Sequence, residues 1–485
     1  MPKNIQVIPR PFTVYTEKNI EKIPQLSKFS RDEVLAMRAV ANVLPFRVND
    51  YVIDELIDWD RVPDDPMFQL TFPQPGMLKD GELDAMIDLI RKDAPRSDLK
   101  AEARRIQLGL NPHPAGQKSM NVPKLEGIEV AGMQHKYRET VLFFPSAGQI
   151  CHSYCTYCFR WPQFVGLDDM KFAAREADRM VEYLKQHPEV NSVLFTGGDP
   201  MVMKTRVFRR YVEPLLQPEL DHIVSIRIGT KAMAYWPGRF VTDNDSDDLM
   251  RLFDEVHSAG RNISVMAHYS NPVELETPMG QAAVERVRNA GAVVRCQAPL
   301  IQHVNDNAET WANMWKRQVT LGAIPYYMFV ERDTGPRAYF EVPLGEAFQI
   351  FTEAYQKVSG LARTVRGPSM SSTPGKVLID GIAEVQGKKV YVLKFIQGRN
   401  PDWVNQVFFA DYDPAARWLD DLKPAFCDRW WWQEELEQMQ QEGWTGDWSQ
   451  DSHIEKRVSD LGHVSFAPAA AGANTLDRNM VLQRP

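Results

Sequence analysis

Short apolar runs alternate with amphipathic stretches through the middle of the chain. The runs lie at 140–145, 192–196, 222–228, 261–267, 292–298 and 324–330. Between them, apolar residues recur at helical spacing over 168–187, 203–217, 246–259, 278–290 and 308–321. Strands that alternate with helices predict parallel βα units joined by right-handed crossovers. Because six units are fewer than the eight of a closed barrel, the pattern predicts an α/β fold with a partial (βα)6 barrel. A doubly wound open sheet is the alternative.

The N-terminal part has a different pattern. Residues 1–30 are rich in Lys, Pro and Ile and predict an arm without strong structure. Helical signals follow over 31–60 and 81–108, and Ser30-Arg31-Asp32-Glu33 has the form of a capping box at the start of the first helix. A Pro-rich connector is expected between these helical regions, at 61–75.

The chain after the barrel predicts a helix and then strands near 377–379 and 389–393. Trp430-Trp431-Trp432 lie in a segment that predicts an amphipathic helix over 426–445, whose tryptophans cover the core or a contact in a homo-oligomer. From 446 the chain is polar and predicts a poorly ordered tail. The predicted parts are an N-terminal arm and helical region, the barrel, a C-terminal segment, and the amphipathic helix with its tail, at 1–110, 111–345, 346–425 and 426–485.

Composition limits the classes of function. The chain has 485 residues, a net charge of −8 and a pI of about 5.8, with no basic block of the kind that binds nucleic acid. No apolar stretch approaches the ~20 residues of a membrane span, and the N-terminus lacks the apolar core of a secretion signal. We therefore expect a cytoplasmic protein that binds neither nucleic acid nor membrane.

Three of the five cysteines lie in one short segment, Cys151, Cys155 and Cys158, at C-x3-C-x2-C spacing. Thiolates hold iron–sulfur clusters, and a four-iron cluster commonly takes four of them. Three thiolates from one loop would leave one iron open to a chelating small molecule. A zinc site with His152 as the fourth ligand is the alternative, whereas a disulfide scaffold does not suit a long chain with so few cysteines.

A glycine motif, Thr196-Gly197-Gly198-Asp199-Pro200, follows the second predicted strand. Adjacent glycines let the backbone approach a ligand closely, although a tight βα turn would use the same residues. Because sites of βα barrels lie at the carboxyl ends of the strands, this motif and the cysteine segment would lie at one edge of the sheet.

The cysteine spacing resembles that of the radical S-adenosylmethionine (SAM) family. Further motifs, in family order and over about residues 110–400, resemble the lysine 2,3-aminomutase family: His135-Lys136-Tyr137-Arg138-Glu139-Thr140-Val141-Leu142, Ile226-Arg227-Ile228-Gly229-Thr230 with Pro237 and Arg239, His268 with Asn271-Pro272, Gln297, Val304-Asn305-Asp306, and Pro325-Tyr326-Tyr327. This resemblance implies a radical SAM barrel, a [4Fe-4S] cluster, SAM and pyridoxal phosphate (PLP). The implied reaction is a 1,2-amino shift in an amino acid or related amine, started by a 5′-deoxyadenosyl radical. An electron donor such as flavodoxin or ferredoxin is the expected partner.

The resemblance also implies roles for single residues. Cys151, Cys155 and Cys158 would bind the cluster, and SAM would contact Gly197, Gly198, Asp199, His268 and Gln297. For His268 a satisfied structural histidine is the alternative. Arg160, two positions after the third cysteine, would hold the substrate carboxylate, to which a bidentate guanidinium is suited. A structural ion pair is the alternative for Arg160.

The distal end of the substrate has a less complete match. Asp306 matches one of two acids that hold the distal ammonium of lysine, and it is also a candidate N-cap for the helix at 308–321. The second acid would fall at 332, where the chain has Arg332 with Glu331 and Asp333 beside it. The cation favours a substrate with an acidic or neutral side chain, whereas its two neighbours favour a basic one.

The PLP site is also altered. Lys376 is the nearest match to the family's PLP lysine, although most glycines before it are missing and an ordinary turn lysine is the alternative. Lys136 matches the first of two basic residues that hold the PLP phosphate, and Thr140 stands in the place of the second. A phosphate dianion in a dry site needs more than one cation or several backbone amides. A PLP-independent radical SAM enzyme and a non-catalytic cluster-binding relative are therefore the alternative functions.

Overall fold

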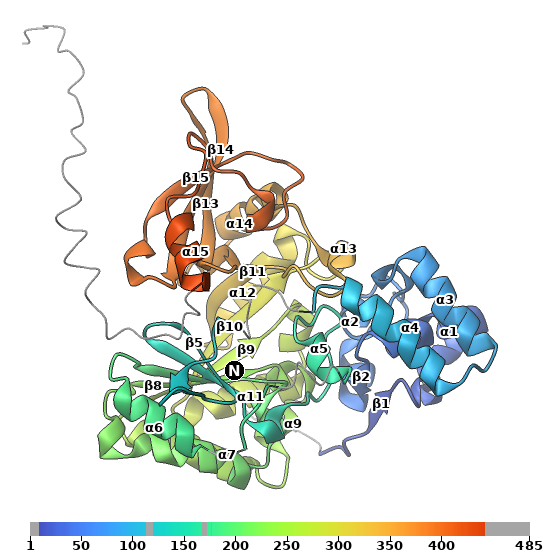
Figure 1. The fold of residues 1–485 in the computed structure, drawn as a ribbon. Helices are drawn as coiled ribbons and strands as arrows, with labels where there is room; N and C mark the ends of the chain where they lie inside the picture. Colours follow the sequence, from blue (N-terminus) through green and yellow to red (C-terminus); the bar gives the residue numbers. More distant parts are fainter. Residues whose placement is uncertain (1–8, 113–119, 167–171, 176, 442–485) are drawn as a thin grey trace, which may run out of the picture. The chain divides into compact units, whose positions relative to one another are not determined.

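One sheet of eleven strands runs through the computed structural model, which describes residues 9–112, 120–166, 172–175 and 177–441. Its centre consists of parallel strands (Figure 1), which are β6 (Thr140–Phe143), β7 (Ser192–Phe195), β8 (Ser225–Thr230), β9 (Asn262–His268), β10 (Val293–Leu300) and β11 (Ile324–Val330). These are the six predicted strands, so the predicted α/β fold is confirmed. Strands follow one another across the sheet in sequence order, whereas a doubly wound sheet reverses at a switch point. The doubly wound alternative is therefore wrong.

The sheet curves until the two ends of its parallel part meet. β5 (Met133–Tyr137) pairs antiparallel with β6, and β12 (Arg366–Ser371) pairs parallel with β11. Lys136 of β5 donates a 2.5 Å hydrogen bond from Nζ to the carbonyl oxygen of Ser372, which directly follows β12. Six strands lie between β5 and β12 in the sheet. One side chain can span that distance only because the sheet is rolled into a partial barrel.

Helices alternate with the parallel strands as predicted: α6 (Asp178–Gln186), α7 (Thr205–Val212), α10 (Ser246–Ser258), α11 (Pro278–Asn289) and α12 (Ala308–Thr320). Part of the first predicted helix, 168–171, lies outside the described residues. Strand residues alternate between the helix-covered face and the barrel interior. In β8, for example, Ile226 and Ile228 are fully buried in the core while Arg227 between them is only half-buried. Shorter elements complete the barrel region: β3 (Lys124–Leu125), β4 (Ile128–Glu129), α5 (Trp161–Phe164), α8 (Ala232–Tyr235), α9 (Gly238–Val241) and α13 (Arg337–Phe340).

The C-terminal segment extends the barrel's own sheet. After α14 (Leu344–Gln356) and β12, the strands β13 (Gly375–Val385), β14 (Lys388–Gly398) and β15 (Val407–Asp411) add antiparallel to its edge. The strands predicted near 377–379 and 389–393 are thus confirmed. They enclose a second hydrophobic core, separate from the one around the barrel, which includes Phe395, Trp403 and Phe408.

The three consecutive tryptophans precede the last described helix, α15 (Gln433–Gln441). The prediction that they lie on that helix is wrong, because the helix begins only at Gln433. Trp432 is 5% exposed and its ring lies 5.8 Å from that of Phe395, so it closes the second core, while Trp431 is 44% exposed. The predicted tail from 446 lies outside the described residues.

The N-terminal region is more structured than its sequence suggests. The predicted helical regions contain α1 (Arg31–Val43), α3 (Asp80–Arg91) and α4 (Arg96–Gly109), and Ser30 and Glu33 form the predicted capping box. The predicted arm contains β1 (Val14–Thr16), which pairs with β2 (Arg47–Asn49). The predicted connector contains α2 (Pro66–Thr71), because the Asp65 carboxylate accepts hydrogen bonds from the first backbone amides of that helix. Within the described part of the chain, no helix has the length and apolar character needed to cross a membrane.

The N-terminal region holds the loop that carries the clustered cysteines. Asn49 of β2 is fully buried; its backbone N–H donates to Ser153 Oγ at 3.0 Å, and its Nδ2 donates to the carbonyl of Tyr235 at 2.9 Å. Thr156 Oγ1 donates to the carbonyl of Gln69 at 2.8 Å. The backbone amides of Tyr154 and Thr156 donate to the carbonyls of Arg47 and Leu70, at 2.8 and 2.9 Å, so two segments far upstream in the sequence hold the backbone of the loop.

Replacing Asn49 by Ala should loosen this loop. The change keeps the backbone bond to Ser153 but removes the Asn49 amide, whose Nδ2 donates to the carbonyl of Tyr235 and, at 3.5 Å, to that of His152 in the loop. These buried carbonyls lose a partner, so we expect the free energy of unfolding to fall by about 1–3 kcal/mol. In the metal-free protein, the three loop cysteines should also react faster with a thiol reagent. The measurements are denaturant unfolding and the labelling rate of each cysteine by mass spectrometry. Asn42→Ala, at an exposed position of α1, is the matched control. Equal labelling rates in the two variants would contradict the support assigned to Asn49.

Candidate functional site

The clustered cysteines lie between β6 and α5, at the carboxyl edge of the barrel. Cys151, Cys155 and Cys158 are free thiols and half-buried. Burial raises the pKa of the Cys151 and Cys155 thiols and raises that of Cys158 to about 12. The three thiols can all be deprotonated in this partly buried loop only if a cationic group offsets the negative charge of the thiolates. A bound metal provides that positive charge.

The arrangement fits a cluster better than a single zinc ion. No three His, Cys, Asp or Glu side chains in the described ranges converge as ligands of one ion. His152 packs its ring edge-on against Phe12 at 5.7 Å, and the structure does not bring it together with the three thiols as a fourth ligand. In a four-iron cluster each thiolate binds a different iron, so the sulfurs surround a shared space without meeting at a point. The donor set therefore fits a [4Fe-4S] cluster.

The glycine motif after β7 supports the start of this loop. A Cβ atom on Gly197 would lie 2.4 Å from Gln149 Nε2, and one on Gly198 would lie 2.6 Å from the backbone nitrogen of Ile150. Gly197 also has a φ of +149°, which few other residues adopt. The two glycines are therefore required for the close approach of β7 to the residues immediately before Cys151.

The Asp199 side chain ties the ends of β7 and β8 together. Its carboxylate accepts hydrogen bonds from Thr230 Oγ1 at 2.7 and 2.8 Å, and from the backbone amides of Met201 and Lys231 at 2.9 Å each. Burial raises the pKa of Asp199 to about 6, although these hydrogen bonds act in the opposite direction. With its oxygens already bonded, Asp199 acts as a positioning residue for this edge, and backbone groups of the motif remain to contact a ligand.

His268 ends β9 and pairs with Gln297, which lies within the neighbouring strand β10, and the two side chains touch each other. Gln297 Nε2 and His268 Nε2 are 2.7 Å apart, so the ring nitrogen accepts from the amide. Burial and then the charge of Lys231 lower the pKa of His268 to about 3, so the ring is neutral. The structure thus brings these two predicted SAM contacts together, and His268 is also satisfied as a structural histidine.

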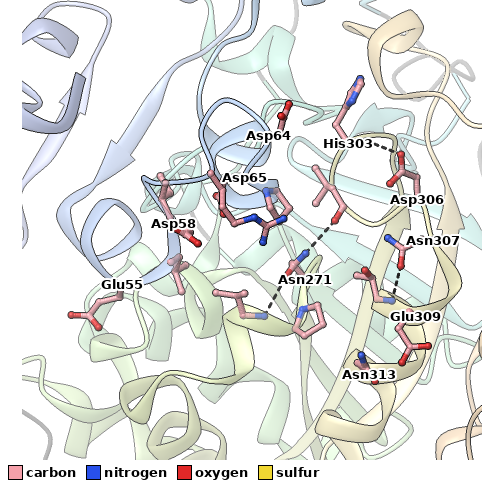
Figure 2. A pocket seen from close by; sticks show the side chains of 18 residues that line it. Glu55, Asp58, Asp64, Asp65, Asn271, His303, Asp306, Asn307, Glu309 and Asn313 are labelled. Atoms are coloured by element: carbon pink, nitrogen blue, oxygen red, sulfur yellow. Dashed lines mark hydrogen bonds between the residues drawn. The ribbon is translucent and has the colours of Figure 1, made fainter. Parts of the chain in front are cut away.

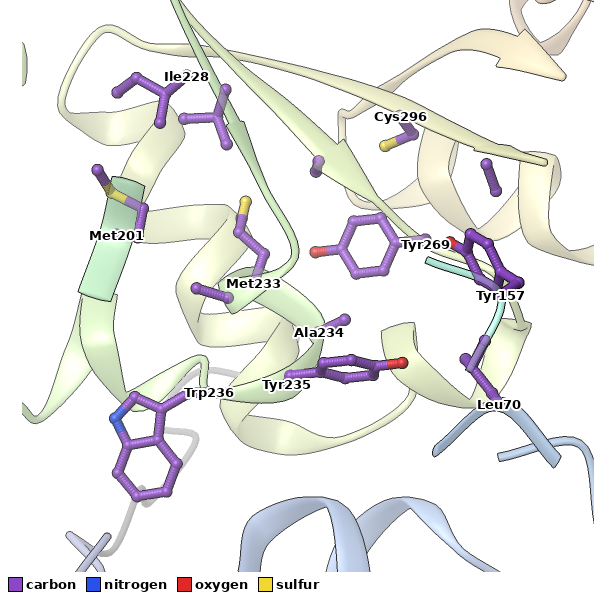
Figure 3. Close-up of a cluster of buried hydrophobic side chains, with 14 of the residues drawn as sticks. Leu70, Tyr157, Met201, Ile228, Met233, Ala234, Tyr235, Trp236, Tyr269 and Cys296 are labelled. Atoms are coloured by element: carbon purple, nitrogen blue, oxygen red, sulfur yellow. The ribbon is translucent and has the colours of Figure 1, made fainter. Parts of the chain in front are cut away.

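Three buried phenol rings, one of them from the cysteine loop itself, lie in the same hydrophobic cluster (Figure 3). Tyr157, Tyr235 and Tyr269 are at most 7% exposed, and the Tyr235 hydroxyl lies 3.3 Å from Cys155 Sγ. Next to these rings Lys231 forms a 2.7 Å ion pair with Glu274, whose side chain is fully buried. Neither feature could be predicted from the sequence, since buried tyrosines and an ion pair between distant residues have no characteristic spacing along the chain.

Arg160 and Arg332 lie against the same aromatic ring. The Arg160 guanidinium carbon is 5.3 Å from the centre of the Phe159 ring, and that of Arg332 is 5.2 Å from it. Burial, and after it the charge of Arg332, lowers the pKa of Arg160 to about 10, with no carboxylate among the described groups that act on it. The ion-pair alternative for Arg160 is therefore not supported. The pair forms a compact, water-poor binding place for carboxylate groups.

The two acids beside Arg332 do not cancel its charge equally. Glu331 is 7% exposed, and burial raises its pKa far above the usual range for a carboxyl group, which favours the neutral acid. Asp333 is held to the N-terminal region, since Asn111 Nδ2 donates to its carbonyl at 2.6 Å and to its carboxylate at 3.4 Å. Of the charged groups around Arg332, Asp333 has the largest effect, and it raises the pKa of the guanidinium against the effect of burial.

Lys376 and Lys136 share the barrel interior. Lys376 lies in β13 with its ammonium 4.2 Å from the centre of the Tyr327 ring, so the turn-lysine alternative is wrong. Burial, then the charges of Arg366 and Arg227, lower the pKa of Lys376 to about 7. Burial also lowers the pKa of Lys136, and Lys376 is one of the cations that contribute. These two predicted PLP residues are brought together.

Asp306 lies elsewhere, in an acidic cavity of about 650 Å³ between the N-terminal region and the barrel (Figure 2). Its carboxylate accepts from the backbone amide of His303 at 3.1 Å. The N-cap of α12 is Asn307, whose side chain accepts from Thr310, so the prediction of Asp306 as N-cap is wrong by one residue. Neither Arg160 nor Lys376 lines this cavity. The structure therefore does not bring Asp306 together with the other predicted substrate residues.

Comparisons with known proteins found relatives of this chain by sequence. A protein of Aquifex aeolicus (strain VF5), provisionally named an L-lysine 2,3-aminomutase, is 30% identical over 408 residues, which are 83% of this chain and 93% of that protein. The L-lysine 2,3-aminomutase of Escherichia coli (strain K12) is 30% identical over 250 residues, 50% of this chain and 68% of the relative. No protein-family model matches the chain. Among solved structures, a radical SAM methyltransferase from Sphaerobacter thermophilus aligns with 46% of this chain and 66% of its own at 13% identity, with a TM-score of 0.34.

The lowered pKa of Lys376 predicts an unusual pH dependence. An amine reacts with acylating reagents only in its neutral form, so labelling of Lys376 should rise with pH and level off above its pKa of about 7. Ordinary lysines continue to rise toward a pKa near ~10.4. Competitive acetylation followed by mass spectrometry measures this midpoint. Arg366→Gln removes a nearby positive charge and should raise the midpoint. A wild-type Lys376 that titrates with the ordinary lysines would contradict the burial described here.

Proposed function

Since this chain belongs to the lysine 2,3-aminomutase family of radical SAM proteins, we propose that it is an isomerase that moves the amino group of an amino acid to the neighbouring carbon. The observation that carries the proposal is the combination of parts in one barrel: three thiols on one loop, Arg160 directly after them, and the buried Lys376 in the interior. A cluster-binding protein without turnover would need only the first of these parts.

The proposed reaction needs three groups that residues of this chain would hold. The three cysteines would bind a [4Fe-4S] cluster, the glycine motif with the His268–Gln297 pair would bind SAM, and Lys376 with Lys136 would bind PLP. When bound, the cluster with SAM would supply a carbon-centred radical for hydrogen abstraction, and PLP would supply a conjugated system that delocalises the unpaired electron during the shift. A one-electron donor such as flavodoxin or ferredoxin would complete the system.

The chain's own residues perform binding, orientation and exclusion of water. Arg160 would hold the substrate carboxylate through a bidentate pair, with its guanidinium fixed over Phe144 at 4.2 Å. Lys376, with a pKa of about 7, offers a neutral amine for attachment of an aldehyde near neutral pH. The aromatic rings around both residues keep water away from reactive species.

Arg332 argues against lysine as the substrate. In the family resemblance an acid at this place holds a distal ammonium, and here a guanidinium shares the Phe159 ring with Arg160. A second cationic group on the substrate would be repelled at short range in a poorly solvated site. We therefore propose an amino acid whose side chain is acidic or neutral.

The cluster assignment predicts a specific dependence on three of the five cysteines. Anaerobic reconstitution should load about four irons per chain, and addition of SAM and reductant should yield 5′-deoxyadenosine. Replacing Cys151, Cys155 or Cys158 by Ala should abolish that product, because each thiolate binds one iron. Cys427→Ala, at an exposed cysteine, is the control and should retain it. Iron analysis, electron paramagnetic resonance and chromatography are the measurements. A wild-type protein that binds only zinc, or never cleaves SAM, would remove the proposal.

The substrate assignment predicts a charge preference that depends on Arg332. With the reconstituted enzyme and PLP, a panel of L-amino acids should show conversion of an acidic or neutral substrate to its β-amino isomer, at unchanged mass, and little conversion of lysine. If the substrate is acidic, Arg332→Ala should lower kcat/KM by about 10- to 100-fold, and Arg332→Lys should restore part of it. Mass spectrometry of derivatised products measures the outcome. Preferential turnover of lysine would contradict the charge argument while leaving the reaction type intact.

A further inference from the structure

Tyr235 places its hydroxyl group at one of the three cysteine sulfurs. It ends the short helix α8 and is 1% exposed. The hydroxyl oxygen lies 3.3 Å from Cys155 Sγ, and in the described part of the chain that hydroxyl has no other hydrogen bond. A thiolate that binds iron carries no proton, so with a cluster in place the phenol is the donor. Cys151 and Cys158 have no such side-chain donor among the described residues.

Lys231 lies against the Tyr235 ring and is itself held in place. Its ammonium nitrogen is 4.6 Å from the centre of the ring. The same nitrogen donates to Glu274 Oε1 at 2.7 Å, to Ser270 Oγ at 3.2 Å and to the carbonyl of His268 at 3.4 Å. A cation over the face of a phenol attracts the electrons of the ring. The hydroxyl group of Tyr235 is therefore a stronger donor than that of an isolated tyrosine.

Glu274 is an acid near the same sulfur, and Lys231 offsets it. The Glu274 side chain is fully buried, and its second oxygen accepts from the backbone amides of Ser270 and Asn271 at 2.5 and 3.1 Å. Both charges act on Cys155. Lys231, which favours the thiolate, has a larger effect than Glu274, which disfavours it. The ion pair thus fixes the position of the cation without removing its effect on the sulfur.

The backbone of Tyr235 is held from the N-terminal region. Asn49 Nδ2 donates to the carbonyl of Tyr235 at 2.9 Å and to the carbonyl of His152 at 3.5 Å. One buried amide thus connects the end of α8 with the cysteine loop. The distance between the Tyr235 hydroxyl and the Cys155 sulfur is therefore set from both sides by buried, hydrogen-bonded groups.

We propose that Tyr235 and Lys231 raise the reduction potential of the cluster through its Cys155 ligand. This inference rests on the proposed function, because it needs the [4Fe-4S] cluster that the loop would hold. Reduction takes one electron from the flavodoxin- or ferredoxin-type donor, makes the cluster with its thiolates one unit more negative, and forms or breaks no bond. A hydrogen bond and a cation at a ligand sulfur stabilise the more negative state. Both are positioning residues, since they act through Cys155, and neither is among the residues that carry the family resemblance.

The test measures the potential of the reconstituted cluster in the full-length protein, by redox titration followed with electron paramagnetic resonance in the absence of SAM. Tyr235→Phe keeps the ring and removes the donor. It should make reduction less favourable by about tenfold, which is a shift of about 59 mV to more negative potential for one electron. Replacing Tyr235 by 3-fluorotyrosine, a stronger donor, should shift the potential in the opposite direction. Tyr269→Phe is the matched control, because that hydroxyl is equally buried and has no hydrogen-bond partner among the described residues. It should keep the wild-type potential.

The outcomes separate this inference from the proposed function. Equal potentials in wild type and Tyr235→Phe overturn it, while the cluster and the reaction stand. A shift of the same size in Tyr269→Phe overturns it as well, since the change would then come from altered packing of the core. If Tyr235→Phe does not fold or load iron, the fluorotyrosine protein decides: a more positive potential supports the inference, and an unchanged one overturns it. A wild-type protein that holds no cluster overturns the inference together with the proposed function.

Discussion

The positive charge inside the barrel is the constraint on which the rest of the site depends. Half-buried arginines and lysines from β5, β8, β10, β12 and β13 act on one another in the interior of the barrel. Bringing such groups out of water is unfavourable unless an anion joins them. The fold tolerates this because its stability comes from the other faces of the same strands, where apolar side chains pack against the helices. Because successive side chains of a strand point to opposite faces, one set of residues stabilises the fold and the other set is available to bind ligands.

That separation explains what the sequence could predict. The six parallel strands and their helices followed from apolar runs of the expected length, because burial between sheet and helices demands them. Residues joined by short local motifs, such as the cysteines and the glycine motif, could be placed at the correct edge. Arg227 and Arg295 were visible as charged positions within apolar runs. Their meeting at Tyr326 depends on the curvature of the sheet, which no local pattern encodes.

The errors have local physical causes. The helix at Pro66–Thr71 lies in a Pro-rich segment, and that composition predicts a connector. Proline in the first turn and the capping Asp65 nevertheless favour a helix there. Asp306 lies within a motif of the family resemblance, yet the backbone after β10 directs it into a separate acidic cavity. The support that β2 and α2 give to the cysteine loop joins residues about a hundred positions apart in the chain. A backbone carbonyl is present in every residue, so the sequence does not show which residue accepts such a hydrogen bond.

The continuous sheet also limits how this protein can diverge. Lys376 lies on β13, which is hydrogen-bonded to β12 on one side and to β14 on the other, and β14 helps to enclose the core that Trp432 closes. The C-terminal segment is consequently not a module that recombination could exchange, since its loss would remove an interior lysine and expose the edge of the barrel. Variation is tolerated better at the turn between β13 and β14, where Gln386 and Gly387 adopt positive φ at the far end of the hairpin. In descendants of this chain, insertions should accumulate at that turn, and the strands that lead to Lys376 should keep their length.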